Sequence, residues 1–368
     1  MTPKERILAA FRGEGAPVVW QPRLEHWYNV NKAQGTLPPR YRGMQLLEVY
    51  DDLGCSVRPY HIFNRTIRAI DDARLKVRVE ERAKEVVITY DTPVGSVQAV
   101  EYRTALAQQR LEFPLKTPAD LPVMEWMLRG RRWEFDREAY DRGVQEVGDR
   151  APPTIYLARV SLQRLFLEYM GFENTVYALH DYPKEMERFI RTIEETDDEM
   201  YRVVCDSPIP VINLGDNVHS DMLPPPLFER WILPYYQRRA AQLREAGKFS
   251  YAHWDGYVRP LLPYARRCGF DGLEAITPLP QGDVTLEEVK EAFGDELVLV
   301  DGLPATDFLP ETPVDELVER TQRILQLFFP RLVLGISDEM SPPGDIERVR
   351  LVSELVADYN RGTPAGRG

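Results

Sequence analysis

Eight short apolar segments alternate with amphipathic stretches along this chain of 368 residues, and the alternation constrains the fold more than any other feature. The apolar segments are the expected strands: residues 18–21, 55–58, 154–160, 210–214, 248–252, 272–275, 297–300 and 332–336. Strands separated by helices form parallel sheets, so eight of them predict an α/β fold closed into a (β/α)8 TIM barrel. The competing fold, an open doubly wound sheet, usually has a glycine-rich turn after its first strand, whereas this chain reads Trp20-Gln21-Pro22-Arg23.

Two segments fall outside the alternation. Thr2-Pro3-Lys4-Glu5 is typical of a helix capping box with proline at the first helical position, and it predicts an N-terminal helical extension through Phe11. Residues 75–102 alternate apolar and polar side chains around Thr92-Pro93-Val94-Gly95, which predicts an inserted antiparallel β-hairpin. We therefore expect one domain over residues 1–360 and a disordered tail at residues 361–368.

Charge and composition limit the partners of the chain. A net charge of −12 argues against nucleic acid as a partner, because a nucleic-acid backbone requires a basic surface. No apolar run is long enough to span a membrane, and the first residues do not resemble a secretory signal. The three cysteines are isolated, which indicates a reducing compartment. We expect a cytoplasmic protein with a small-molecule substrate; the sequence is also compatible with a homodimer.

Polar residues follow the expected strands, where the chemistry of a barrel lies. His253 and Asp255 come directly after the segment 248–252, and Asp338 and Glu339 follow the segment 332–336. Residues i and i+2 of a strand point the same way, so His253 and Asp255 can face one cavity. Together with Glu339 they predict either an acid/base cluster or a three-ligand metal site. Asp338 is an alternative third member, and a merely hydrogen-bonded histidine at a strand end is the simpler interpretation of His253.

Three further residues are candidates for a catalytic role. Asp216 and Asn217 follow the segment 210–214, although both are also good turn formers. Glu274 lies inside an apolar segment, where an unpaired carboxylate would be costly, so we expect a buried partner or a metal beside it.

Five other residues near expected strand ends are candidates for substrate binding. Arg23 and Arg58 can hold a carboxylate or phosphate, or they can brace loops. His26 can form an acid/base couple with its neighbouring glutamate, or it can simply begin a surface helix. His61 and Trp254 can line a pocket for a flat substrate, with ordinary core packing as the alternative.

Several short segments, in their order along the chain, carry a family resemblance. They include Thr92-Pro93-Val94-Gly95, Gly215-Asp216-Asn217 and Pro342-Pro343-Gly344-Asp345, together with residues 2–13 and 114–121. In these segments the chain resembles the uroporphyrinogen decarboxylase superfamily, which also contains the corrinoid-dependent methyltransferases. The resemblance covers nearly the whole chain, and it implies a TIM barrel with its active site at the strand ends.

The resemblance is nearer to the methyltransferase branch. Methyltransferases of this family carry His-x-Cys-Gly and a late cysteine before a proline-rich turn, and all three residues bind zinc. Here His253-Trp254-Asp255-Gly256 has Asp255 at the first cysteine position, and Glu339 stands at the second. The resemblance thus implies zinc held by His253, Asp255 and Glu339. The zinc would polarise the heteroatom that bears a methyl group, and cobalamin on a corrinoid partner protein would accept that group.

Two alternatives remain open. Decarboxylases of the family carry Arg-Gln-Ala-Gly-Arg and Phe-Ser-Asp-Ile motifs, whereas this chain reads Gln21-Pro22-Arg23-Leu24-Glu25 and lacks the second motif. A metal-free carboxy-lyase of tetrapyrrole metabolism, with arginines on the substrate carboxylates, is the second hypothesis. The third is a non-catalytic barrel that binds a tetrapyrrole or a corrinoid protein. The many ionisable residues at strand ends argue against it, because binding pockets are mostly apolar.

Overall fold

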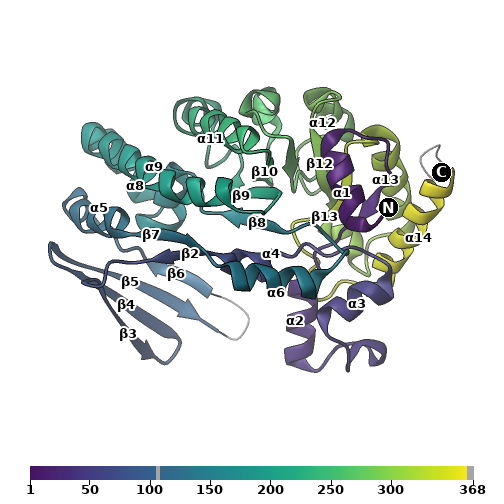
Figure 1. The fold of residues 1–368 in the computed structure, drawn as a ribbon, viewed down its shortest axis with the longest axis horizontal. Coiled ribbons are helices and arrows are strands. Elements are labelled where there is room, and N and C mark those ends of the chain that lie inside the picture. Colours follow the sequence, from purple (N-terminus) through teal and green to yellow (C-terminus); the bar gives the residue numbers. More distant parts are fainter. Residues whose placement is uncertain (105–107, 363–368) are drawn as a thin grey trace. The chain divides into compact units, whose positions relative to one another are not determined.

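The computed structural model describes residues 1–104 and 108–362 (Figure 1). These residues form two compact units. The barrel unit comprises Met1–Asn64, Glu138–Ala158 and Ile209–Gly368, and the second unit comprises Arg65–Arg137 and Arg159–Pro208. The expectation of one domain over residues 1–360 stays a prediction.

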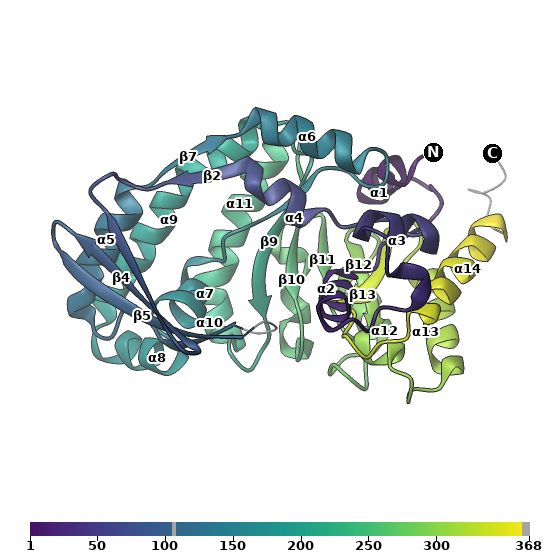
Figure 2. The same cartoon turned by 90° about the horizontal axis from the view of Figure 1, so that it is seen from below.

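A seven-stranded parallel sheet forms the core of the barrel unit, with the strand order β1-β13-β12-β11-β10-β9-β8. The strands are β1 (Val19–Trp20), β8 (Thr154–Leu157), β9 (Val211–Val218), β10 (Phe249–Trp254), β11 (Gly272–Glu274), β12 (Val298–Pro304) and β13 (Leu332–Ser337). Every neighbouring pair is parallel, and Figure 2 shows β9 to β13 side by side. These seven strands coincide with seven of the eight predicted segments, and the predicted TIM-barrel fold is confirmed.

The prediction of a strand at residues 55–58 is wrong. The segment runs beside β1, because the Ser56 amide donates to the Trp20 carbonyl oxygen at 2.8 Å and Gln21 Nε2 donates to the Val57 carbonyl oxygen at 2.8 Å. No ladder develops from these contacts. The next residue is Pro59, which has no amide proton to donate, and the chain turns there into a short helix.

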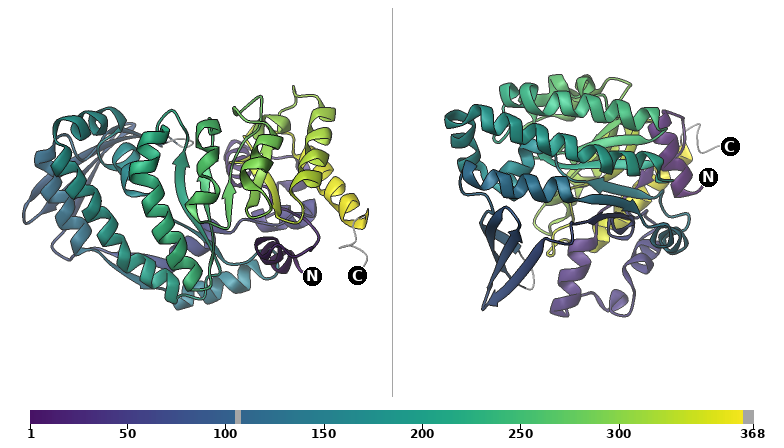
Figure 3. Two further views of the ribbon diagram at one scale, coloured as in Figure 1. Left: turned by 90° about the horizontal axis from the view of Figure 1, so that it is seen from above. Right: turned by 60° about the vertical axis from the view of Figure 1, so that its left-hand side comes forward.

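Helices surround the parallel sheet of the barrel unit. They are α1 (Pro3–Arg12), α2 (Glu25–Gln34), α3 (Leu46–Leu53), α4 (Tyr60–Phe63), α6 (Arg137–Val147), α10 (Pro225–Leu227), α11 (Leu233–Glu245), α12 (Leu286–Phe293), α13 (Val314–Phe328) and α14 (Ile346–Gly362). Short 3-10 or π turns are η1 (Pro39–Tyr41), η5 (Phe228–Ile232), η6 (Arg259–Tyr264), η7 (Arg266–Cys268) and η8 (Ala305–Phe308). Figure 3 (left) shows α14, in yellow, beside α13.

The two chain ends were predicted with different success. The capping box of α1 is confirmed, since the Thr2 side chain accepts from the Glu5 amide and the Glu5 side chain accepts from the Thr2 amide. At the other end α14 continues to Gly362, so Arg361 and Gly362 are helical and do not belong to a disordered tail. The remainder of the predicted tail, residues 363–368, lies outside the described residues. Among the helices of the described ranges, none is both long and apolar enough to cross a membrane.

Helix α1 supplies an aromatic side chain to the interior of the barrel unit. The Phe11 ring stacks on Phe249 and Tyr251, with centroid separations of 5.4 and 5.8 Å. Residues 249, 251 and 253 of β10 point to the same face of the strand, because side chains alternate between the two faces. Phe11 therefore fills the interior near the start of β10. Tyr251 and His253 come later along the same face of the strand.

The second unit combines antiparallel strands with helices. It contains β2 (Ile67–Ile70) paired with β7 (Arg132–Phe135), and a meander of β3 (Lys76–Arg82), β4 (Glu85–Thr92), β5 (Gly95–Arg103) and β6 (Gln108–Glu112), seen as dark blue strands in Figure 3 (right). Its helices and turns are η2 (Asn64–Thr66), η3 (Pro118–Asp120), α5 (Leu121–Gly130), α7 (Ser161–Arg164), η4 (Leu165–Tyr169), α8 (Phe172–Asp181) and α9 (Pro183–Asp206). The predicted hairpin is confirmed, with Thr92 opposite Gly95 at its turn, and the structure extends it to four strands.

Close packing inside the barrel unit gives a stability prediction for Gly335 of β13. A Cβ atom at this position would lie 2.9 Å from the Gln21 carbonyl oxygen and closer still to Asp301 Oδ1. Gly335→Ala should therefore lower the free energy of unfolding by about 2 kcal/mol, the usual scale of overpacking. Chemical denaturation measures this change. Gly43→Ala is the control, because a Cβ atom there meets nothing within 4 Å; equal midpoints for the two variants would contradict the packing.

Candidate active site

A buried ionic cluster lies at the centre of the barrel unit. Arg58 Nη1 donates to Glu274 Oε1 at 3.1 Å, and Arg58 Nη2 donates to Asp301 Oδ1 at 2.5 Å. The three side chains are at most 1% exposed. Taking charges out of water costs several kcal/mol for each ion, so these groups are tolerated only because they neutralise one another. Arg58 is the buried partner that the sequence requires for Glu274.

Hydrogen bonds fix the second oxygen of Glu274. Oε2 accepts from the Tyr60 hydroxyl at 3.0 Å and also from Asn213 Nδ2. Asn213 Nδ2 donates to the Tyr60 oxygen at 2.6 Å as well, and the hydroxyls of Tyr60 and Tyr251 lie 2.6 Å apart. Both carboxylate oxygens of Glu274 are thus bound to buried partners, which leaves the side chain little freedom to move.

His253 is held by this carboxylate. The two residues are register partners on the neighbouring strands β10 and β11, and His253 Nδ1 lies 3.4 Å from Glu274 Oε1. With the Nδ1 proton directed at Glu274, the other ring nitrogen is turned away, and Nε2 lies 4.0 Å from Asp255 Oδ2. A carboxylate behind an imidazole fixes its orientation and tautomer, as in many acid/base and metal sites.

The charges of the cluster shift the acidities of its members in different directions. Burial alone would lower the pKa of His253, but the hydrogen bond and charge of Glu274 raise it, which favours the imidazolium form. Burial alone would raise the pKa of Glu274, but Arg58 and His253 lower it below its usual range, so this carboxyl is ionised. Burial raises the pKa of Asp301, although Arg58 acts in the opposite direction. Burial also raises the pKa of Asp255.

Arg23 connects the buried cluster to an exposed pair of acids. Its Nη1 lies 3.8 Å from Glu274 Oε1 and 2.9 Å from Asp338 Oδ1, while its Nη2 lies 3.0 Å from Glu339 Oε1. The Arg23 side chain is 18% exposed, whereas that of Asp338 is 62% exposed. Arg23 and these acids therefore form the solvent-facing mouth of the site.

Strained backbone occurs within or just after the strands that carry the cluster. Among the described residues, four that are not glycine have a positive φ angle, and three of them lie at neighbouring strands: Ala275 after β11, Asp301 in β12 and Asp338 after β13. Such conformations cost roughly 1–3 kcal/mol each and persist where surrounding contacts impose them. The concentration of strain beside the ionic cluster is typical of an active site.

The structure brings together four of the candidate residues and places two more beside them. Arg23, Arg58, His253 and Glu274 are in direct contact through the pairs described above. Asp255 lies next to His253, and Glu339 next to Arg23.

The remaining candidates lie in surroundings of their own. Asp216 is buried and accepts a hydrogen bond from Tyr236 of α11 at 2.5 Å, because its side chain points away from the face of β9 that carries Asn213. Asn217 lies near the end of β9. His26 and His61 are exposed helix residues. Trp254 is fully buried with its ring edge-on to Phe228, at a centroid separation of 5.4 Å.

The predicted zinc ligands can be compared with this geometry. His253 and Asp255 face each other across 4.0 Å. The Asp255 Oδ1 atom is a buried acceptor with no hydrogen-bond partner among the described residues. The third, Glu339, pairs with Arg23. Within the described ranges no group of three or more His, Cys, Asp and Glu side chains is gathered closely enough to hold a metal ion. These side chains therefore do not form a three-ligand site as they stand, and zinc stays a prediction.

Sequence reasoning missed four members of the cluster: Gln21, Asn213, Tyr251 and Asp301. Gln21 Oε1 accepts from Arg58 Nε at 3.3 Å. The signal for Asn213 and Tyr251 was available, since each is a polar group within an apolar strand, and Tyr251 precedes His253 by two positions. Asp301 pairs with Arg58 through a contact between residues 243 positions apart, which no local pattern of the sequence predicts.

Comparison with known proteins finds a matching family model and solved structures with a similar fold. The family model described as "Uroporphyrinogen decarboxylase (URO-D)" matches residues 164–359. No curated protein matches the chain. A solved methyltransferase from Methanosarcina mazei shares 16% identity over 98% of this chain and 99% of that chain, with a TM-score of 0.59. A B12-independent methionine synthase from Shewanella sp. W3-18-1 shares 11% identity over 94% and 97%, with a TM-score of 0.42. The first likeness concerns the fold alone, and the second is too loose to support an argument.

The buried cluster generates a prediction for Arg58. Arg58→Met leaves Glu274 and Asp301 as two uncompensated buried acids, and it should lower the free energy of unfolding by about 3–5 kcal/mol. Urea denaturation measures the loss. Arg40→Met removes an exposed ion pair with Asp52 and should change the midpoint little.

A triple variant keeps this prediction testable if Arg58→Met is insoluble. Replacing all three charges together, by Arg58→Met, Glu274→Gln and Asp301→Asn, should recover soluble protein, because no buried carboxylate is then left unpaired and the amide oxygen at position 274 still accepts hydrogen bonds. Equal stability of Arg58→Met and the parent protein would contradict the role given to the cluster.

Proposed function

The chain belongs to the uroporphyrinogen decarboxylase family, and from this premise we propose that it is a methyltransferase that moves a methyl group from a small methylated or methoxylated substrate to a corrinoid protein. The observation that carries the proposal is the His253–Glu274 pair, which lies at the strand ends. Arg58 donates a hydrogen bond to the Glu274 carboxylate and so holds it in place. The full-length fold likeness to the Methanosarcina mazei methyltransferase adds support. So does the position of His253, which corresponds to the histidine of the family's methyltransferase motif, with Asp255 in place of the first cysteine of that motif.

Methyl transfer from a heteroatom requires a group that stabilises the atom left behind. The bond from the heteroatom to the methyl carbon breaks, its electron pair stays on the heteroatom, and that atom then takes up a proton. Cobalamin on the partner protein supplies the nucleophile that accepts the methyl group. His253 is the proposed proton donor, because Nδ1 is tied to Glu274 while Nε2 faces Asp255 on the side of the mouth. Glu274 keeps the ring oriented and stabilises its cationic form.

Arg23 is the proposed binding group for an anionic substrate. Its partners Asp338 and Glu339 are exposed or partly exposed, so a substrate carboxylate can replace one of them at the guanidinium. Arg58 cannot take this role without breaking the cluster, because Glu274 and Asp301 occupy its guanidinium. Substrates with one carboxylate and a nearby methoxy or methylated group fit this arrangement best.

The pairing of Arg58 with two buried acids weighs against the carboxy-lyase hypothesis. A porphyrinogen carries several carboxylates, and a decarboxylase needs several arginines with free guanidinium groups. Here Arg58 is fully buried and paired on both sides. We therefore keep decarboxylation as the second candidate, to be recognised by conversion of uroporphyrinogen into coproporphyrinogen.

His253→Gln should reduce the methyl-transfer rate by about 10²-fold or more, the usual contribution of a general acid. The measurement follows methylcobalamin formation from cob(I)alamin on a corrinoid protein, with methoxylated and N-methylated carboxylates as donors. His26→Gln is the matched control, since this histidine is exposed and lies outside the cluster, and it should keep the parent rate.

Two results would decide against the proposal. One is an unchanged rate in His253→Gln. The other is coproporphyrinogen production by the parent protein together with no methyl transfer to any donor, which would instead support the carboxy-lyase.

The zinc prediction has a separate test. If His253, Asp255 and Glu339 hold zinc, protein purified without a histidine tag should contain about one zinc per chain, a value that Asp255→Asn should lower. His180→Gln should leave the zinc content unchanged, because His180 is an exposed residue of the second unit. If the parent protein lacks stoichiometric zinc and keeps its activity in chelator, the zinc site is wrong, and His253 remains as the proton donor.

A further inference from the structure

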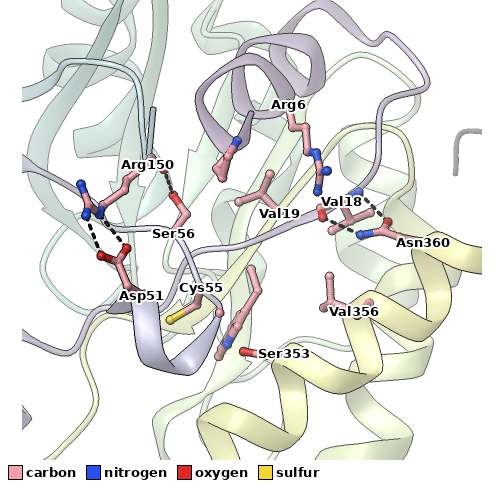
Figure 4. A pocket seen from close by; sticks show the side chains of 14 residues that line it. Arg6, Val18, Val19, Asp51, Cys55, Ser56, Arg150, Ser353, Val356 and Asn360 are labelled. Atoms are coloured by element: carbon pink, nitrogen blue, oxygen red, sulfur yellow. Dashed lines mark hydrogen bonds and ion pairs between the residues drawn. The ribbon is translucent and has the colours of Figure 1, made fainter. Parts of the chain in front are cut away.

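A pocket of about 380 Å³ lies on the outer side of β1, apart from the candidate active site. It is bounded by α1, by the start of β1, by the segment after α3 and by the last turns of α14 (Figure 4). None of the residues of the ionic cluster lines it. The volume is in the usual range for small-molecule sites. Nothing in the proposed methyl transfer uses this pocket.

The floor of the pocket is apolar. Val19 and Trp20 of β1 line it together with the preceding Val18, and Val356 lines it from α14. Cys55 adds a thiol whose pKa is raised by burial, so this side chain is uncharged as well. The floor suits a compact hydrocarbon or aromatic group.

Most polar groups at the rim are already occupied. Arg150 makes two bonds to Asp51, with Nε to Oδ1 at 2.7 Å and Nη2 to Oδ2 at 2.6 Å. The Asn360 side chain accepts from the Val18 amide at 2.8 Å and donates to the Val18 carbonyl oxygen at 2.9 Å. These contacts hold α14 and α3 in place around the pocket, and they leave neither an unpaired charge nor a reason to recognise a cation.

Arg6 differs from the other polar groups of the rim. Its Nε donates to the Met1 carbonyl oxygen at 3.1 Å, and among the described residues no acid pairs with its two terminal nitrogens. Figure 4 shows this guanidinium directed from α1 toward the apolar floor near Val18. An unpaired guanidinium with two adjacent donors favours a planar carboxylate. The net charge of the rim is therefore positive, although the chain as a whole is acidic.

We propose that this pocket is a second small-molecule site, which binds a carboxylate with a compact apolar body. The carboxylate pairs with Arg6 at the rim, and the apolar body lies on Val19, Trp20 and Val356. The ligand is bound without reacting.

Calorimetric titration of the full-length protein with 2-naphthoate, and with neutral 2-naphthamide, tests this site. 2-Naphthoate should bind with one site per chain, and 2-naphthamide should bind about tenfold more weakly. Arg6→Gln should weaken 2-naphthoate about tenfold, because a hydrogen-bonded charge is lost. Ala357→Trp, at an exposed position of α14 that lines the pocket, should fill the space and abolish binding.

Two controls separate this pocket from other surfaces. Arg12→Gln removes an exposed arginine at the far end of α1 and should not change the affinity. Arg23→Gln should not change it either, because Arg23, the proposed carboxylate-binding group of the candidate active site, does not line this pocket. The proposal is overturned if the parent protein shows no saturable binding, if Arg6→Gln and Ala357→Trp bind like the parent, or if Arg23→Gln abolishes binding.

Discussion

The pairing of Arg58 with two buried acids is the interaction on which the rest of the site depends. A guanidinium has enough donors to neutralise Glu274 and Asp301 at once, and no solvent reaches either contact. Glu274 is thereby fixed as an ionised carboxylate, and it can orient His253 on the next strand. If the arginine is removed, both acids become costly and the histidine loses its support.

The same interaction explains why the barrel is irregular at one position. Arg58 ends the segment that lies beside β1, where a regular strand was predicted, and Gln21 bonds both to Arg58 and to the backbone of Val57. Side-chain bonds thus hold this segment, since Pro59 cannot extend a ladder. The segment 55–58, which does not form the predicted strand, thus supplies Arg58, the central charge of the site.

The site consists of layers with different exposure to solvent. In the buried part, Phe11 stacks on Tyr251, and the Tyr251 hydroxyl is hydrogen-bonded to that of Tyr60. The charge cluster is buried as well, and at the mouth Arg23 contacts acids that are open to solvent. Groups that orient the histidine are therefore buried and fixed, while the group proposed to bind substrate can exchange its partners.

The architecture follows from local patterns: seven of the eight predicted strands, the capped first helix and the inserted hairpin could all be predicted from neighbouring residues. The sequence also indicated that Glu274 needs a partner and that His253 lies at a strand end. Only the tertiary structure decided which charges meet. Arg58 and Asp301 are 243 positions apart, and the placement of Asp216 toward α11 or of Glu339 on Arg23 depends on side-chain direction and on competing partners. Periodicity predicts which face a residue takes on its own strand, but the contacts of a buried charge are settled by the whole barrel around it.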